Sequence, residues 1–170
     1  MVTRSAGRTS ADLLGIYLND HLAGATAGAE LAHRMARSHT SPAAASAMQR
    51  LAAEVAQDRS ALLEIMARLS VPTRGYKVWA AWVGEKAGRL KFNGNVRSRS
   101  ALSDLEELEM LRLGVEGKAA GWRTLRAFAA SDPRLDGARL DDLILRARRQ
   151  ADLLEDLRVR AAEELIGMNG

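Results

Sequence analysis

One stretch of the chain decides the fold: residues 31–51, LAHRMARSHTSPAAASAMQRL. Leu31 and Met35 close a series of apolar residues at helical spacing that begins near Ser10. Ser41 followed by Pro42 is typical of a helix start, because serine caps free N–H groups and proline suits the first helical position. So few residues separate the two patterns that two long helices have to lie side by side and antiparallel.

The same apolar spacing continues beyond this stretch. It predicts four long helices in all, at residues 10–38, 42–69, 101–130 and 136–166. A shorter helix is predicted at 76–90, and the Asn93-Gly94 turn signal marks a basic loop from residue 91 to residue 100. We therefore expect an all-α fold, with a flexible tail at residues 1–9 and one helical-bundle domain from residue 10 to residue 170.

Composition excludes several classes of protein. With 47% hydrophobic and 27% charged residues, the chain can bury a core within one domain. It has no cysteine, which excludes disulfides, thiolate metal sites and cysteine nucleophiles. The first ten residues show no apolar signal region, and no apolar run approaches the ~18 residues of a membrane span. We expect a cytoplasmic protein that does not cross a membrane.

The order of short, long and short connections between the four helices resembles the ferritin-like superfamily, over nearly the whole chain. The resemblance implies two antiparallel helix pairs joined by a crossover. It also implies a di-iron or di-manganese centre at the middle of the bundle. In such centres two helices each supply a glutamate and the other two each supply Glu-x-x-His.

Several polar residues fall near the middle of the predicted helices, on or beside their apolar faces. They are His21, Glu54, Asp58, Glu109, Glu116 and Gln150. Carboxylates and imidazoles are the ligands that two adjacent divalent cations need in a core. These six residues are therefore the candidate ligands of an atypical iron or manganese site.

The family's ligand motif is nevertheless missing. Neither 42–69 nor 136–166 contains Glu-x-x-His, and the one such motif, Glu30 to His33, lies in the first helix. The favoured interpretation is a buried polar cluster without metal. Its hydrogen bonds would be completed by ion pairs with Arg59, Arg112 or Lys118.

Two features of the predicted crossover suggest interactions. Trp79 and Trp82 share a face, which would either clamp the short helix onto the bundle or dock a partner. Lys91, Arg97 and Arg99 surround the basic loop and are the best candidates for binding phosphate or nucleic acid.

Two further features concern the long helices. Arg146 to Arg149 are expected to form a stripe on the surface of the last helix. Gly24 and Gly28 share a face of the first helix, where they would allow a neighbour to approach closely.

The function that follows is a non-catalytic structural or interaction module that forms a homo-oligomer, with a dimer as the first guess. One alternative is a metal-binding oxidoreductase or metal-storage protein with an atypical mid-bundle site. Another is a basic DNA-associated bundle, which the net charge of +4 permits but does not favour. Whether the protein has a small-molecule substrate is unknown from the sequence.

Overall fold

The computed structural model describes residues 9–38, 42–74 and 101–167. Within these ranges the structure is all-helical and contains no strand. The four helices are α1 (Ser10–Ser38), α2 (Pro42–Arg68), α4 (Ala101–Phe128) and α5 (Gly137–Gly167). They confirm the four predicted long helices, with bounds that differ by two residues at most. The helix predicted at 76–90 and the loop at 91–100 lie outside the described residues.

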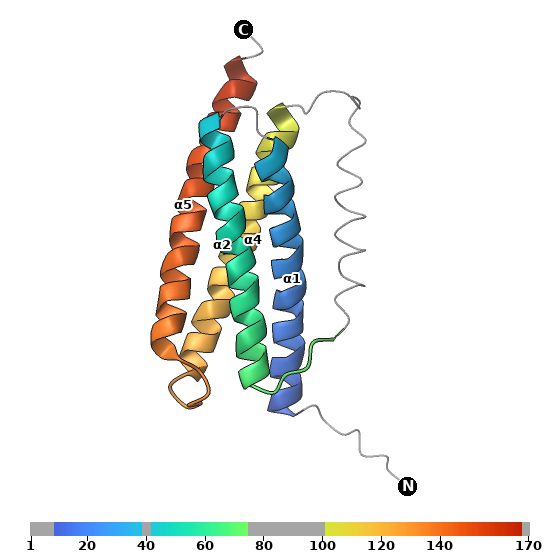
Figure 1. Ribbon diagram of the computed structural model, residues 1–170, viewed down its shortest axis with the longest axis vertical. Helices are drawn as coiled ribbons and strands as arrows, with labels where there is room; N and C mark the ends of the chain where they lie inside the picture. The colour runs from blue at the N-terminus through green and yellow to red at the C-terminus, as the bar shows by residue number, and fades with distance from the viewer. Residues whose placement is uncertain (1–8, 39–41, 75–100, 168–170) are drawn as a thin grey trace.

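The four helices form a bundle of two antiparallel hairpins (Figure 1). The first hairpin pairs α1 with α2 and the second pairs α4 with α5, and these two pairs pack most closely. Between the hairpins, α1 packs against α4, whereas α2 and α5 share only a small contact. Because α2 and α4 run in the same direction, the end of α2 and the start of α4 lie at opposite ends of the bundle (Figure 1).

Local hydrogen bonds explain where two of the helices begin or end. The Thr9 hydroxyl accepts the Asp12 N–H (3.2 Å), and the Asp12 carboxylate accepts the Thr9 N–H (3.1 Å), so the first turn of α1 is capped reciprocally. Beyond α2, Ser70 adopts a left-handed conformation with φ of 57°. The Val71 N–H then bonds back to the Met66 carbonyl (2.9 Å), which ends the helix.

The core runs along the axis of the bundle and consists of one apolar stripe from each helix. Leucines, methionines and alanines dominate it, and Trp122 is its one large aromatic side chain within the described residues. No helix of the described ranges combines the length and hydropathy that a bilayer crossing requires. Two buried polar side chains, Asp58 and Gln150, interrupt this apolar core near its middle, and the candidate site is built around them.

Candidate functional site at the middle of the bundle

Asp58 of α2 lies at the centre of the polar cluster and is only 1% exposed. Its Oδ2 accepts a hydrogen bond from the Lys118 ammonium of α4 at 2.6 Å. Its Oδ1 forms an ion pair with the Arg146 guanidinium of α5. Both carboxylate oxygens are therefore occupied by cations of this chain, each from a different helix.

Gln150 of α5, also 1% exposed, completes the cluster. Its amide oxygen accepts from the Lys118 ammonium at 2.5 Å, and its amide nitrogen donates to Glu54 (2.9 Å) and to Asp58 (3.2 Å). We call Glu54, Asp58, Lys118, Arg146 and Gln150 the mid-bundle network. It joins α2 of one hairpin to α4 and α5 of the other.

The charges of the network balance, because two carboxylates face two cations. Burial lowers the pKa of Lys118, since a buried ammonium loses its hydration, while the neighbouring Asp58 carboxylate opposes that shift. Two of the three N–H bonds of the ammonium donate to Asp58 and Gln150. A buried pair of this kind persists only when such hydrogen bonds offset the lost hydration.

The donors present do not fit the di-metal centre that the family resemblance implies. Such a centre needs four carboxylates and two histidines, whereas the network holds two carboxylates, an amide and two cations. In the part of the chain that the structure describes, no three His, Cys, Asp or Glu side chains gather as metal ligands would. Of the six candidate ligands, the structure brings together Glu54, Asp58 and Gln150.

His21 lies apart from the network, in the contact between α1 and α4. Its ring meets the Tyr17 ring edge-on, with centroids 4.4 Å apart. It also packs against Gly121, where an added Cβ would lie 3.1 Å from the imidazole. Burial lowers the pKa of His21, while the charge of Asp20 opposes the shift. His21 therefore serves as a packed, half-buried histidine of the α1–α4 contact.

The two remaining candidate ligands, Glu109 and Glu116, are exposed on α4. Glu109 comes within 3.8 Å of Arg158, and its side chain is 50% exposed. Both glutamates point away from Asp58 because they lie on the flank of α4 that turns outward. The spacing of apolar residues in the sequence had placed both glutamates closer to the core than they lie.

Of the three cations expected to pair with the cluster, Lys118 alone reaches it. Arg59 donates instead to the Thr26 hydroxyl of α1 at 2.9 Å. Arg112 pairs with Glu155 of α5 at 3.1 Å. Lys118 reaches the cluster because its side chain extends from α4 to Asp58 of α2 and Gln150 of α5.

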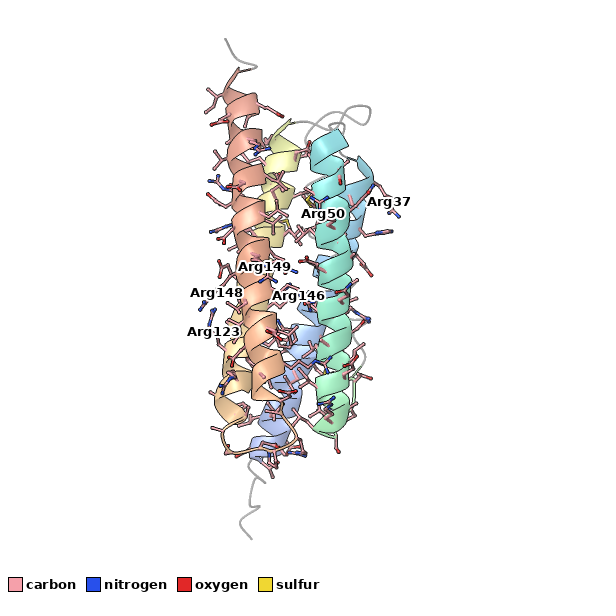
Figure 2. The ribbon with its side chains drawn as sticks, turned by 60° about the vertical axis from the view of Figure 1, so that its left-hand side comes forward. Arg37, Arg50, Arg123, Arg146, Arg148 and Arg149 are labelled. Carbon is pink, nitrogen blue, oxygen red and sulfur yellow. The ribbon has the colours of Figure 1, made fainter. Side chains whose placement is uncertain are left out.

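Arg146 corrects the expectation of a continuous arginine stripe on the surface of the last helix. It turns toward α2, whereas Arg148 lies on the opposite side of α5 (Figure 2). The Arg146 side chain is 24% exposed, and its guanidinium reaches Asp58 from α5. A signal for this was present in the sequence, since Arg146 stands one helical turn before the buried Gln150.

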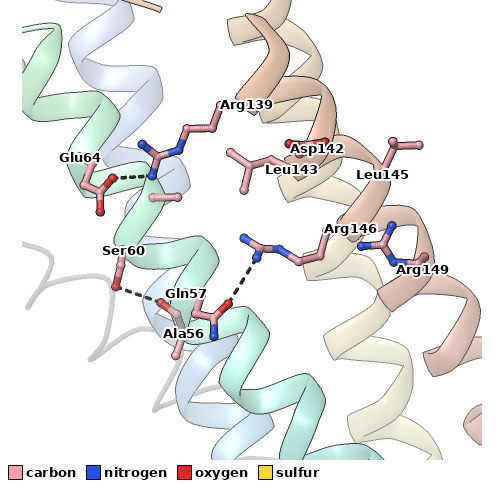
Figure 3. Close-up of a pocket in the computed structure, with 11 residues that line it drawn as sticks. Ala56, Gln57, Ser60, Glu64, Arg139, Asp142, Leu143, Leu145, Arg146 and Arg149 are labelled. Carbon is pink, nitrogen blue, oxygen red and sulfur yellow. Dashed lines mark hydrogen bonds and ion pairs between the residues drawn. The ribbon is translucent and has the colours of Figure 1, made fainter. Parts of the chain in front are cut away.

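A groove of about 690 Å³ opens between α2 and α5, directly outside the network. Small and polar side chains of α2 form one wall, and arginines, leucines and Asp142 of α5 form the other (Figure 3). Arg139 forms an ion pair with Glu64 across it, and Arg146 donates to Gln57 at 3.3 Å. The groove exists because α2 and α5 pack least closely of the neighbouring helices.

No protein-family model, curated protein or solved structure matches this chain. The predicted interaction residues Trp79, Trp82, Lys91, Arg97 and Arg99 lie outside the described residues. What the structure defines directly is a four-helix bundle with a buried ion-pair network at its middle. Any function has to be argued from that network and from the surfaces around it.

Proposed function

We propose that the protein is a non-catalytic structural or interaction module of ferritin-like architecture, in which ion pairs take the place of a metal centre. The two hairpins and the shared direction of α2 and α4 support the ferritin-like part of the proposal. A cytoplasmic location and assembly into a homo-oligomer, with a dimer first, belong to the same proposal.

The observation that carries the proposal is the position of the Lys118 ammonium. In a metal centre, the ions supply the positive charge that lets carboxylates stay ionised in a core. Here Lys118 and Arg146 supply that charge, and they use both oxygens of Asp58. A divalent ion entering the network would have to displace a largely buried cation and leave it unpaired, which is costly.

Elemental analysis by mass spectrometry tests the proposal. The protein would be purified without chelator or affinity-tag metal, together with Asp58→Ala and, as a matched surface control, Glu116→Gln. We expect less than stoichiometric iron, manganese and zinc in all three samples. Near-stoichiometric metal in the wild type and in Glu116→Gln, but not in Asp58→Ala, would contradict the proposal. It would favour the metal-storage or oxidoreductase alternative.

The groove between α2 and α5 is the surface that supports an interaction role. Its size lies within the range of ligand sites, and its walls combine apolar and charged groups. Three arginines face Glu64 and Asp142 there, so positive charge is largely balanced instead of clustered. Nucleic acid prefers a clustered basic surface. We therefore propose a protein partner for this surface.

A labelled DNA duplex and a salt titration test the nucleic-acid alternative. We expect no shift of the duplex at low salt beyond that produced by a basic protein of similar charge. Tight binding that weakens steeply with salt would instead favour the DNA-associated alternative. Arg149→Glu changes the wall of the groove. Arg148→Glu makes the same change in charge on the opposite side of α5 and is its matched control.

A further inference from the structure

Two opposite charges beside the α2–α5 groove have no partner within the described part of the chain. Asp142 and Arg149 of α5 are both exposed, and both line the groove. The other charged side chains that line it already form ion pairs. Asp142 and Arg149 take part in no hydrogen bond or ion pair with any described residue. Both are therefore free to meet charges of another molecule.

Leu145 lies between these two charges along the groove (Figure 3). Residues 142, 145 and 149 follow one another at intervals of three and four, which keeps them on one side of a helix. The Leu145 side chain is a large apolar group that is 49% exposed. This face of α5 thus presents an acidic, an apolar and a basic group in that order, over about 10 Å.

This order makes the face complementary to itself. Asp142 precedes Leu145 by three residues, and Arg149 follows Arg146 by three. A twofold axis that passes between Leu145 and Arg146 places a second α5 antiparallel to the first. Each Asp142 then stands opposite Arg149 of the other copy, and the two Leu145 side chains meet beside the axis. A twofold interface requires such a surface, because each copy contributes the same residues.

The charges also favour this alignment of two α5 helices over its neighbours. With the axis at this point, residues 137–154 of the two copies overlap over about 27 Å. No residue in the overlap falls opposite one of the same charge, and Arg139 comes opposite Asp152. Sliding the helices by three residues sets Asp142 against Asp152. Sliding them in the other direction sets Arg139 against Arg149. Like charges that face each other cost affinity, so one register is selected.

We propose that the protein partner of the α2–α5 groove is a second copy of this chain, with its α5 antiparallel across the opening of the groove. Two ion pairs between Asp142 and Arg149 flank a central pair of Leu145 side chains. Two of the α2 residues that line the groove, Ala56 and Ser60, are small and exposed, which leaves room for the second helix. This interface rests on the proposed function, since it gives the proposed homodimer its contact surface.

Charge reversal followed by light scattering tests the proposal on the full chain. Asp142→Arg leaves only arginines at the two positions, and Arg149→Asp leaves only aspartates. The molar mass would be measured across a concentration series at low salt, where charges are screened least. We expect a dimeric wild type. Each single variant should raise the dissociation constant roughly tenfold to a hundredfold, because two ion pairs become two repulsions.

Two rescues separate charge complementarity from damage to the fold. Asp142→Arg/Arg149→Asp exchanges the charges and should recover most of the wild-type affinity. An equimolar mixture of the two single variants should form a dimer, because each arginine of one chain then meets an aspartate of the other. Arg148→Asp, on the opposite side of α5, and Asp156→Arg, beyond the overlap, are exposed controls with matched changes in charge and should stay dimeric.

Disulfide cross-linking gives a second readout, because the chain has no cysteine of its own. Leu145→Cys, beside the proposed axis, should form a disulfide-linked dimer several-fold faster than Leu113→Cys, which is 70% exposed on α4. Circular dichroism would establish that every variant keeps its helix content. Equal rates of cross-linking for the two cysteine variants would count against the proposal.

The outcomes distinguish this interface from the proposed function. A wild type that is monomeric at every concentration would overturn the interface together with the proposed homodimer. A wild-type dimer that the single reversals leave intact, or that neither rescue restores, would overturn the interface alone. Dissociation of the two control variants to the same extent would also overturn it. Metal content is measured separately and is bound to none of these results.

Discussion

At the scale of single residues, Asp58 is the member of the mid-bundle network whose loss we expect to cost the most stability. Two cations from α4 and α5 depend on its carboxylate for their charge balance. A buried ion pair adds little net stability compared with apolar packing, but removal of one partner leaves the other charge buried and alone. The loss in free energy of unfolding should therefore depend on which member of the mid-bundle network is removed.

We expect Asp58→Leu to lower the free energy of unfolding by about 3–5 kcal/mol, because it strands both Lys118 and Arg146. Lys118→Met should cost clearly less, since Asp58 keeps Arg146 and Gln150 as partners. Urea titrations followed by circular dichroism measure both, with Glu109→Gln as an exposed control. Equal losses for Asp58→Leu and Lys118→Met would contradict this view of the network.

His21 predicts a dependence of stability on pH. Burial holds its pKa below the usual value, so the unfolded chain binds the proton more readily than the folded protein. The stability that this histidine contributes is present above its unfolded pKa and is lost as pH falls through the ordinary histidine range, around 6.5. The melting temperature should fall more steeply for the wild type than for His21→Gln between about pH 8 and pH 5.

The comparison for His21 is His33→Gln, since His33 is exposed on the same helix. That variant should follow the wild-type curve. If His21→Gln also follows the wild-type curve, the half-buried His21 imidazole is not the source of the pH dependence.

At the scale of the helices, the ends are set by short-range chemistry. Thr9 and Asp12 cap α1 reciprocally, and their spacing is visible in the sequence. The end of α2 is less favourable, because Ser70 holds the left-handed conformation that suits glycine. A non-glycine residue in that conformation costs roughly 1–2 kcal/mol.

Ser70→Gly should therefore stabilise the protein by about 1 kcal/mol, because it relieves this strain without changing the hydrogen bond from Val71 to Met66. Thermal unfolding and urea midpoints measure the change. Ser70→Ala is the matched control and should not stabilise, since alanine keeps the Cβ that causes the strain. A gain from alanine as large as that from glycine would contradict the explanation.

At the scale of the whole molecule, the bundle consists of two close hairpins that the mid-bundle network helps to join. Asp58 and Glu54 belong to the first hairpin, whereas Lys118, Arg146 and Gln150 belong to the second. Because hydrogen-bonded polar groups have stricter geometry than apolar contacts, the network can fix how the hairpins align.

An all-apolar replacement separates alignment from stability. We expect Asp58→Leu/Lys118→Met/Arg146→Leu/Gln150→Leu to keep its melting temperature or raise it, because hydrophobic side chains of similar volume often replace buried charges without loss. Its amide NMR spectrum should nevertheless broaden as the hairpins lose a unique alignment. Sharp, well-dispersed signals in this variant would show that apolar packing alone aligns them.

The sequence alone determined the four long helices and their bounds to within two residues. Apolar spacing and the Ser41-Pro42 start act over a few residues, so they can be read without knowing the neighbours. It also identified Asp58 and Gln150 as polar residues in a core and Lys118 as a partner, because a buried charge needs a counter-charge wherever it lies.

Only the tertiary structure decided which of these residues meet. Whether Arg146 or Arg149 turns inward, and whether His21 reaches Asp58 or Gly121, depends on the rotation of each helix about its own axis. A sequence pattern leaves that rotation uncertain by about a residue, which is about 100° around a helix of 3.6 residues per turn. Likewise, only the placed helices show that a Cβ added at Gly24, Gly28, Gly114 or Gly117 would meet no described atom within 4 Å, because the sequence does not show which neighbour a glycine faces.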